Sequence, residues 1–335
     1  MIVRTLPRLA FVVAICFVLL TGFGGRAQAA DRLLVSHDSV TGLDGYAGVL
    51  AWDQGITTSD GNLVGYRIAV WQHGRVRVAG RRFSAPVGPD VGTDRRGRLV
   101  LVYALCGPTT CGIVMRDVVT GRERRLRMPG EHAKCRDGLR SSASSPSISH
   151  GRIAYLLSPC RGPDRVMLRL ASGANRTLAR VLDHGGVGST DIAGSHVVFS
   201  EKDSFEPVIG FDVGSKILLV DTRGRRVRVI GHAYNDGMSS DAVRSPVLAA
   251  GSAYFLEAAD DGDARSSESL HRIPLQGFPR VRLCDYTQGY GVDSLAVTAG
   301  HRYYITNDNQ SILEDTTPTP TARRCRPPYA VGIPR

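Results

Sequence analysis

Six residues at comparable places along the chain are the candidates for chemistry. Each stands a few residues before a glycine that is followed by an apolar segment: Asp44, Asp90, Ser145, Ser189, Arg244 and Asp293. If these segments are equivalent strands around one axis, their side chains meet at the mouth of a central channel. Three carboxylates around one arginine can receive a cation or a basic group. Aspartate is also common in turns, so an ordinary turn role is the alternative.

A second acidic group, Asp260, Asp261 and Asp263, is the densest in the chain. Carboxylate oxygens are the hard ligands that calcium prefers. The group lacks the spacing of an EF-hand loop, because no glutamate stands at its twelfth position. We interpret it as a solvated acidic loop and only a weak metal candidate. No cofactor is predicted.

Catalytic motifs are absent from the sequence. It contains neither a Gly-x-Ser-x-Gly elbow nor a His-Glu-x-x-His zinc motif, and its nine histidines are scattered without ligand spacing. The sequence therefore favours a non-enzymatic protein. A carboxylate pair assembled from distant strands, as in glycoside hydrolases, is the alternative, since spacing along the chain does not exclude it.

The first 29 residues have the three zones of a cleavable secretory signal peptide. Arg4 and Arg8 precede an apolar run from Leu9 to Leu20, and Ala27-Gln28-Ala29 fits the cleavage pattern. Twelve apolar residues are too few for a bilayer, which needs about 20 in a helix, although a membrane anchor is the alternative. We therefore expect a secreted protein, extracellular or periplasmic, whose mature chain has no transmembrane segment.

The cysteines that follow the signal segment are expected to form disulfides. They are even in number: Cys106, Cys111, Cys135, Cys160, Cys284 and Cys325. An even count in an oxidising compartment indicates disulfides. Proximity favours Cys106–Cys111, Cys135–Cys160 and Cys284–Cys325 among the possible pairings. Zinc sites need Cys-x-x-Cys-type pairs, which this sequence does not contain.

The chain is basic, and almost all of its positive charge is arginine. The formal net charge is +11, and it falls by three when the arginines of the signal segment are removed. The arginines are spread along the chain, and an exported protein rarely meets nucleic acid, so we expect no nucleic-acid partner. Association with an anionic cell envelope is compatible with this charge.

One unit recurs six times, a glycine turn followed by an apolar strand. The glycines are Gly48, Gly97, Gly151, Gly194, Gly251 and Gly300, spaced 49, 54, 43, 57 and 49 residues apart. Such periods are typical of propeller blades. In step with it runs a second unit of two strands joined by a hairpin turn, as at Asp117–Gly121 and Asp221–Gly224.

The last strand of the unit alternates arginine with an apolar residue. It occurs at Arg75–Val78, Arg125–Met128, Arg226–Val229 and Arg280–Leu283. An alternation of apolar and charged residues with a period of two predicts a strand with one buried face and one solvent-exposed face. We interpret the arginines as protection of an edge strand against aggregation; a basic belt that holds an anionic polymer is the alternative.

Together the two units predict a single all-β domain over residues 30–335, a six-bladed β-propeller with four-stranded antiparallel blades. The expected blades are 42–80, 86–129, 144–182, 186–231, 241–284 and 290–325. The last copy is degraded, and Arg32–Ser36 is a candidate for the strand that completes it and closes the ring. A pair of stacked sheets is the alternative, but it does not explain two repeats in register.

The repeat resembles that of TolB-type six-bladed propellers (PD40 or WD40-like repeats). Pro146 to Tyr155, followed by Leu168 to Leu178, has their proline, glycine turn and Ile-Ala-Tyr strand. Ser245 to Phe255 and Asp117 to Leu126 match parts of the same repeat. The Ser-Pro-Asp-Gly turn usual in that family is absent from every copy, so the chain is a divergent relative to which TolB's partner-binding residues do not transfer.

The long loops are expected on one face of the propeller, here called the long-loop face. They are Gln54–Gly65, Ala104–Gly112, Pro129–Ser145, Glu201–Ser215, Gly231–Arg244 and Ala258–Ser269. Binding residues tend to lie on such loops. We therefore predict an exported, monomeric, non-enzymatic propeller that binds a protein, peptide or glycan there. The alternative is an extracellular propeller hydrolase or lyase that acts on carbohydrate.

Overall fold

The computed structural model describes residues 32–37, 39–130, 135, 140–181, 187–202, 205–206, 211–212, 214–224, 226–233, 242–260, 266–276, 292–298, 300–306 and 311–315. The predicted signal peptide, Cys284 and Cys325, Asp261 and Asp263 lie outside these residues. No helix long and apolar enough to cross a bilayer occurs in the part of the chain that is described.

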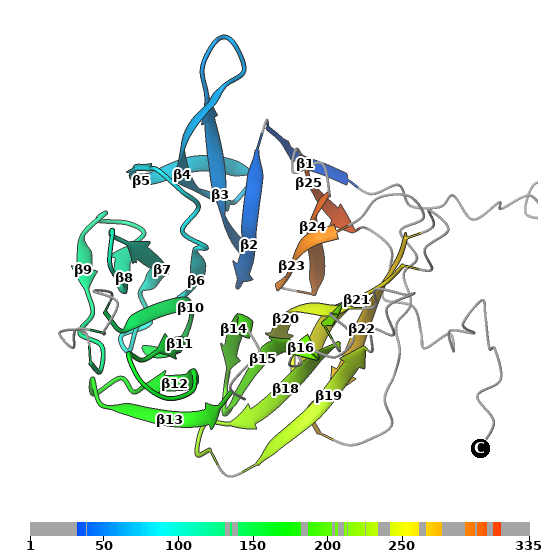
Figure 1. Cartoon of the computed structure of the whole chain (residues 1–335). Coiled ribbons are helices and arrows are strands. Elements are labelled where there is room, and N and C mark those ends of the chain that lie inside the picture. The colour runs from blue at the N-terminus through cyan, green and yellow to red at the C-terminus, as the bar shows by residue number, and fades with distance from the viewer. Residues whose placement is uncertain are drawn as a thin grey trace, which may run out of the picture.

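The first three sheets of the ring each have four antiparallel strands in chain order (Figure 1). The first is β2 (Val40–Tyr46), β3 (Val49–Thr57), β4 (Leu63–Gln72) and β5 (Arg75–Phe83). The second is β6 (Asp90–Thr93), β7 (Leu99–Cys106), β8 (Cys111–Asp117) and β9 (Glu123–Arg125). The third is β10 (Ser142–Ser149), β11 (Arg152–Ser158), β12 (Arg165–Arg169) and β13 (Asn175–Arg180).

The remaining sheets continue around the same centre. The fourth is β14 (Val187–Ala193), β15 (His196–Lys202), β18 (Ser215–Asp221) and β19 (Val227–Ala233), with a small hairpin of β16 (Phe205–Glu206) and β17 (Phe211–Asp212) between β15 and β18. Next comes β20 (Ala242–Ala249), β21 (Ser252–Asp260) and β22 (Ser266–Pro274). The last is β23 (Val292–Thr298), β24 (His301–Thr306), β25 (Ser311–Asp315) and β1 (Arg32–Ser36).

The prediction of an all-β propeller with four-stranded antiparallel blades is confirmed. The described residues form five four-stranded sheets and one three-stranded sheet, where the sequence predicts six four-stranded blades. The sheet of β20, β21 and β22 has three strands, and the fourth strand predicted for it, Arg280–Leu283, lies outside the described residues.

Each blade is held by apolar side chains that pack against the neighbouring blade. The largest fully buried side chains include Trp52, Tyr103, Tyr155 and Phe199, which stand on the second strand of the first four blades. These are the aromatic residues that follow the repeated glycine turns in the sequence. One cluster joins Val102 of the second blade to Tyr155 of the third. A single sheet therefore buries its faces only by stacking on its neighbours, as the repeat predicts.

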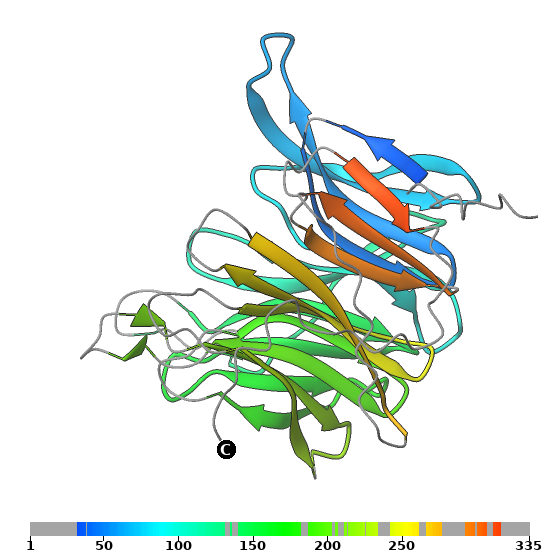
Figure 2. The ribbon, with the colours of Figure 1, turned by 90° about the vertical axis from the view of Figure 1, so that its right-hand side faces the viewer.

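The ring is closed by the N-terminal strand. β1 pairs antiparallel with β25, with Arg32 opposite Glu314 and Ser36 opposite Ser311, and the two strands lie side by side in Figure 2. Leu34 and Val35 pack against the apolar cluster of the first and last blades. The expectation that this strand completes the last blade is confirmed.

The alternation in the outer strands has a different meaning from the predicted one. Val76 and Val78 on β5, and Val227 and Val229 on β19, are 46–49% exposed, so these strands do not have one buried and one wet face. Blades diverge with distance from the axis, and the neighbouring sheet no longer covers them. Of the three alternating segments that the structure describes, the prediction is right in the one of the second blade, where Leu126 and Met128 are buried; Arg280–Leu283 lies outside the described residues.

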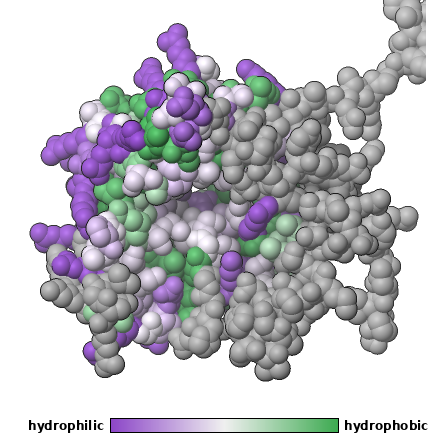
Figure 3. All heavy atoms as spheres, turned by 45° about the horizontal axis from the view of Figure 1, so that its top comes forward, coloured by the Kyte–Doolittle hydropathy of each residue, from purple (hydrophilic) through white to green (hydrophobic). Residues whose placement is uncertain are grey.

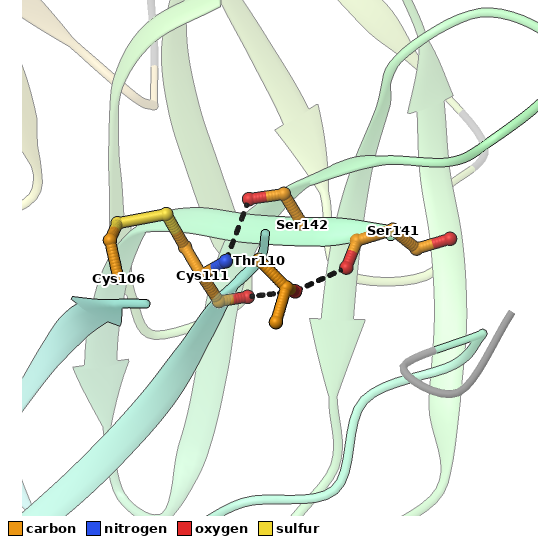
Figure 4. The surroundings of a disulfide bond; sticks show 5 residues. All are labelled: Cys106, Thr110, Cys111, Ser141 and Ser142. Atoms are coloured by element: carbon orange, nitrogen blue, oxygen red, sulfur yellow. Dashed lines mark hydrogen bonds between the residues drawn. A yellow bond between two sulfur atoms is a disulfide. The ribbon is translucent and has the colours of Figure 1, made fainter. Parts of the chain in front are cut away.

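Two disulfides fasten the long-loop face beside the third blade. Cys106–Cys111 closes the hairpin of β7 and β8, and in Figure 4 the backbone N–H of Cys111 donates to Ser142 Oγ at 3.2 Å. Thr110 Oγ1 donates to the carbonyl of Ser141 at 2.7 Å. Cys135–Cys160 is also formed, and Cys160 N–H donates to Ser141 Oγ at 3.3 Å. Both crosslinks therefore converge on the start of β10.

Removing the second crosslink is expected to cost more stability than removing the first. The cysteines are 25 residues apart in Cys135–Cys160 and 5 apart in Cys106–Cys111. The chain-entropy relation then gives about 3.5 kcal/mol for Cys135→Ser with Cys160→Ser, and about 2 kcal/mol for Cys106→Ser with Cys111→Ser. Urea unfolding of both double variants measures the difference. A larger loss for the short loop would contradict this account.

Candidate functional site

The inner strands line a central channel, and a local irregularity sets the direction of their side chains. Gly42, Gly88, Ser145 and Ser245 have the left-handed backbone, with φ of 64°, 58°, 46° and 51°. Register shifts occur beside three of them, at Thr41/Asp44, Ser144/Ser147 and Arg244/Val247. Bulges of this kind re-aim the residues that follow, and non-glycine residues in this conformation cluster at functional sites.

The channel contains two adjoining hollows. One, of about 180 Å³, is lined by the first halves of the inner strands, including the hydroxyl residues Ser145, Ser189, Ser245 and Ser294. The other, of about 220 Å³, is lined by the second halves of the same strands. The first therefore lies toward the long-loop face. A hollow lined by pale residues, which are intermediate on the hydropathy scale, is visible near the middle of Figure 3.

Three carboxylates stand where the two hollows meet. Asp44, Asp90 and Asp191 line both of them, and they come from the first, second and fourth blades. They are the charged residues among the described lining of the channel. A group that enters from either end therefore meets acidic side chains without a basic neighbour in that lining.

Each carboxylate is held by the blade that follows its own. Asp44 Oδ2 accepts from the backbone N–H of Val91 at 2.8 Å, and Asp90 Oδ1 accepts from that of Ile148 at 2.9 Å. Asp191 Oδ2 accepts from the N–H of Leu248 at 2.5 Å. The three side chains thus join adjacent inner strands, and this fixes them in the channel.

The surroundings favour the protonated form of these acids. Burial raises the pKa of Asp44 to about 6, against the opposing effect of its backbone hydrogen bonds. Burial and the charge of Asp44 raise the pKa of Asp191 to about 7. Burial, together with the charges of Asp44 and Asp191, raises the pKa of Asp90 well above its ordinary value. The ionisation of the three acids is therefore linked, and the surroundings shift each of them toward the neutral form.

A fourth buried acid supports the entrance of the channel. Asp53 is fully buried on β3, and its Oδ2 accepts from the N–H groups of Val87 at 2.9 Å and Gly88 at 2.7 Å. Burial raises its pKa to about 6. Asp53 therefore fixes the connection that leads into Asp90, and we regard it as a positioning residue.

The structure brings four of the six sequence candidates together. Asp44 and Asp90 line both hollows, and Ser145 and Ser189 line the one toward the long-loop face. Arg244 is on β20 but lines neither hollow. The expected ring of acids around an arginine is therefore corrected to a group of acids without the arginine. A bulge follows Arg244, and Ser245 within it lines the channel instead. The side chain of Asp293 lies outside the described residues.

Alignment of the repeated glycine turns within the sequence does not select Asp191. It stands two residues after Ser189, as Asp44 stands two after Gly42 and Asp90 two after Gly88. Counting backward from the turn glycine leads to Ser189 instead.

The weak metal candidate receives no support from the described part of the chain. Asp261 and Asp263 lie outside it, and so does the side chain of Asp260. Among the described residues no three histidine, cysteine or acidic side chains are placed to hold a metal ion.

Comparisons with known proteins give similarity only at the level of structure. No family model and no curated protein matches the chain. A putative TolB from Agrobacterium tumefaciens is 17% identical over 58% of this chain and 66% of its own, with a TM-score of 0.44. The chain spans 55% of TolB from Acinetobacter baumannii, so it covers less than two thirds of either protein.

Propellers of peptidases are also among the similar structures. A puromycin-hydrolyzing peptidase of Mycobacterium tuberculosis is 10% identical over 87% of this chain and 53% of its own, with a TM-score of 0.47. The β-propeller domain of the trilobed protease of Pyrococcus furiosus is 8% identical over 85% and 95% of the two chains, with a TM-score of 0.46. The strands of the chain itself make it a β-propeller, and the solved structures to which it is similar include TolB, whose repeats its sequence resembles.

Proposed function

We propose that this chain is an exported, non-enzymatic propeller that binds a protein or peptide and takes a basic group of that partner into its channel. The observation that carries the proposal is the meeting of Asp44, Asp90 and Asp191 between the two hollows, without a basic side chain in the described lining. A lysine, an arginine or a terminal amine supplies the charge and the donors that these oxygens accept.

The size of the channel favours a single side chain over a larger ligand. The hollows measure about 180 and 220 Å³, whereas pockets for small molecules usually measure about 300–1,000 Å³. The walls of the hollow toward the long-loop face combine serine hydroxyls with the rings of Pro89, Pro146 and Pro246 at the start of the inner strands. A narrow entrance with an acidic end suits the apolar stem and charged tip of an extended basic side chain better than the rings of a glycan.

The long-loop face offers further surface around that entrance. The β3–β4 hairpin projects from the first blade (Figure 2), and it carries exposed Leu63 and Val64. The two described disulfides hold neighbouring loops of this face. A partner that inserts one basic residue can thus make its other contacts on fixed loops, as is usual for binding on rigid scaffolds.

A carbohydrate hydrolase is the second candidate, because several carboxylates share one channel. Such enzymes need one protonated and one ionised carboxyl group on opposite sides of a sugar bond. In this chain each acid accepts a backbone N–H from the next blade, and the hollows leave little room for sugar rings. We therefore favour binding, and release of reducing sugar from soluble glycans by the purified chain would favour the enzyme.

The binding proposal is tested with lysine- and arginine-containing peptides and the double variant Asp44→Asn with Asp191→Asn. The wild-type chain is expected to bind at least about tenfold more tightly at pH 8 than at pH 5, because the pKa values of Asp44 and Asp191 are about 6 and 7 and only ionised acids attract the cation. The double variant should bind at least about tenfold more weakly at pH 8 and depend less on pH, because it keeps only Asp90 of the three channel acids.

A matched variant separates the channel from the surface. Asp164→Asn removes an acid between β11 and β12, outside the channel lining, and should bind like the wild-type chain. Isothermal titration calorimetry of the three proteins at both pH values gives the affinities. Equal binding by the wild-type chain and the channel variant would rule out the proposal.

A further inference from the structure

A groove opens between the second and third blades, on the face opposite the long-loop face. Its volume is about 540 Å³, within the usual range for pockets that hold a ligand. It is lined by the turns that join neighbouring strands of these blades, over residues 94–98, 117–122 and 170–173, and by Gly151. The groove is thus separate from the carboxylate channel, and it does not depend on the function proposed for that channel.

Arginine dominates the walls of the groove. Six arginines line it, against three acidic residues: Arg95, Arg96, Arg98, Arg122, Arg124 and Arg169, with Asp94, Asp117 and Glu123. The local surplus is therefore three positive charges. A concave site with a surplus of one sign concentrates ligands of the opposite sign.

The three acids are already paired. Arg98 donates to Asp94 Oδ2 through Nε at 2.9 Å and Nη2 at 2.7 Å, and its Nη1 lies 3.5 Å from Asp117 Oδ2. Glu123 accepts from Arg116 Nη1 at 2.9 Å. Two arginines therefore neutralise most of the acidic charge, and one of the two, Arg116, is not itself among the lining residues.

The other arginines of the rim have no acidic partner in the part of the chain that the structure describes. Arg95, Arg96, Arg122 and Arg124 are exposed, and no side-chain hydrogen bond or ion pair holds them among those residues. They come from the β6–β7 turn, the β8–β9 turn and β9 of the second blade, beside the third blade. Guanidinium groups gathered in this way match the planar oxygens of phosphate and carboxylate.

Arg169 is fixed in the groove from the third blade. Its Nη1 donates to the carbonyl of Gly173 at 2.7 Å and to that of Arg127, across the blade boundary, at 3.3 Å. Its pKa is lowered by burial and also by the positive charge of Arg124, while Tyr155 opposes the shift. Two guanidinium groups from neighbouring blades thus repel each other, and an anion between them relieves that repulsion.

The floor of the groove is apolar. Val100, Leu126 and Ile153 line it and are buried, and Met115 packs against the same cluster. An apolar floor with a cationic rim fits a ligand that has an anionic group on an uncharged body. A bare inorganic ion would leave the floor unused.

We propose that this groove binds a phosphate ester, with the phosphate held between Arg124 and Arg169 and the body of the ligand on the apolar floor. A phosphate monoester brings close to two negative charges and three acceptor oxygens, which suits arginines that approach from two blades. Phosphate esters occur as soluble monoesters and, as diesters with one negative charge, in anionic phospholipids, so the source of the phosphate is decided by experiment.

The test uses the oxidised full-length protein, glycerol 1-phosphate as the soluble probe, and phosphatidylglycerol vesicles as the lipid probe with phosphatidylcholine vesicles as reference. Arg122→Gln with Arg124→Gln is expected to weaken binding of the phosphate probe at least about tenfold. Arg75→Gln with Arg77→Gln removes the same charge from exposed positions on β5 and should change the affinity less than about twofold. Raising the salt concentration should weaken the wild-type interaction.

The outcomes are distinct. Binding of glycerol 1-phosphate that is lost in the groove variant supports a soluble ester, and binding confined to phosphatidylglycerol vesicles and lost in the same variant supports a lipid headgroup. Absence of binding to both probes at low salt overturns the proposal. So does an equal loss in the β5 variant, because it would show attraction by overall charge and not by the groove.

Discussion

Replacing Asp53 by alanine is expected to lower the free energy of unfolding by about 2–4 kcal/mol. The Asp53 carboxylate is fully buried, and one oxygen accepts hydrogen bonds from the N–H groups of both Val87 and Gly88. Alanine removes this acceptor, and an orphaned buried donor costs about 1–3 kcal/mol. Urea unfolding followed by the fluorescence of Trp52, which is adjacent in sequence, measures the loss.

Asparagine at the same position is the matched control. Its amide oxygen can accept the two hydrogen bonds, and its nitrogen takes the place of Oδ1, for which the described residues provide no partner. We expect Asp53→Asn to cost about 1 kcal/mol or less at pH 5. If the alanine and asparagine variants lose the same stability, the hydrogen bonds to Val87 and Gly88 do not contribute as argued here.

The Asp53 carboxyl group gives the stability of the wild-type chain a pH dependence that Asp53→Asn lacks. Burial raises the pKa of Asp53 from 3.8 to about 6, so the folded state binds a proton more tightly than the unfolded state. The stability that this provides is complete below pH 4 and is lost as the pH rises to 6 and above. The loss is on the order of 3 kcal/mol, and Asp53→Asn should not show it. The free energy of unfolding of Asp53→Asn therefore increases relative to that of the wild-type chain as the pH rises.

Much of the fold was predictable because the residues that shape and pack each blade recur at similar positions in the repeat. A glycine turn allows a tight hairpin, and the aromatic residue that follows it fills the space between two sheets, as Trp52, Tyr103 and Tyr155 do. These signals are local, and they recur because each blade solves the same packing problem. The closing strand was predictable for a related reason, since the last copy lacked a complete outer strand and Arg32–Ser36 had no other sheet.

The channel was predictable only in part, because the turns differ in length. Gly48 is the second residue of a two-residue turn, and Gly194 is the first residue of another, between the paired ends of their strands. In the second blade the turn has five residues, between Thr93 and Leu99. The same number of residues counted back from the turn glycine therefore leads to different positions along the inner strand in different blades. In the fourth blade it leads to Ser189 instead of Asp191.

The arginine groove could not be found from spacing at all. Its residues come from turns and strands of two blades, and Arg124 on β9 and Arg169 on β12 line one groove only because the blades stack in the ring. The spacing of the arginines indicates basic character in the outer strands, where the valines of β5 and β19 are exposed together with the arginines. Charge that gathers across a blade boundary depends on register between sheets, and no local pattern encodes that register.

Opening the ring is expected to be the other large perturbation. Leu34 and Val35 of β1 pack into the cluster that joins the first and last blades, and β1 is the partner of β25. Leu34→Asp with Val35→Asp removes apolar contact and forces two charges toward that cluster, which should cost about 4–6 kcal/mol. Hydrogen exchange should show loss of protection in β25 and β24 before the other blades, because β25 would become an edge strand.

A neighbour on the same strand provides the control for closure. Leu33 is 56% exposed, so Leu33→Asp adds a charge to β1 without burying it and should cost about 1 kcal/mol or less. If both variants unfold at the same urea concentration, β1 does not hold the ring together through its side chains. If the double variant alone unfolds early but β25 keeps its protection, the strand contributes to the core without closing the propeller. The combination of early unfolding and selective exposure of β25 is the result that closure by β1 requires.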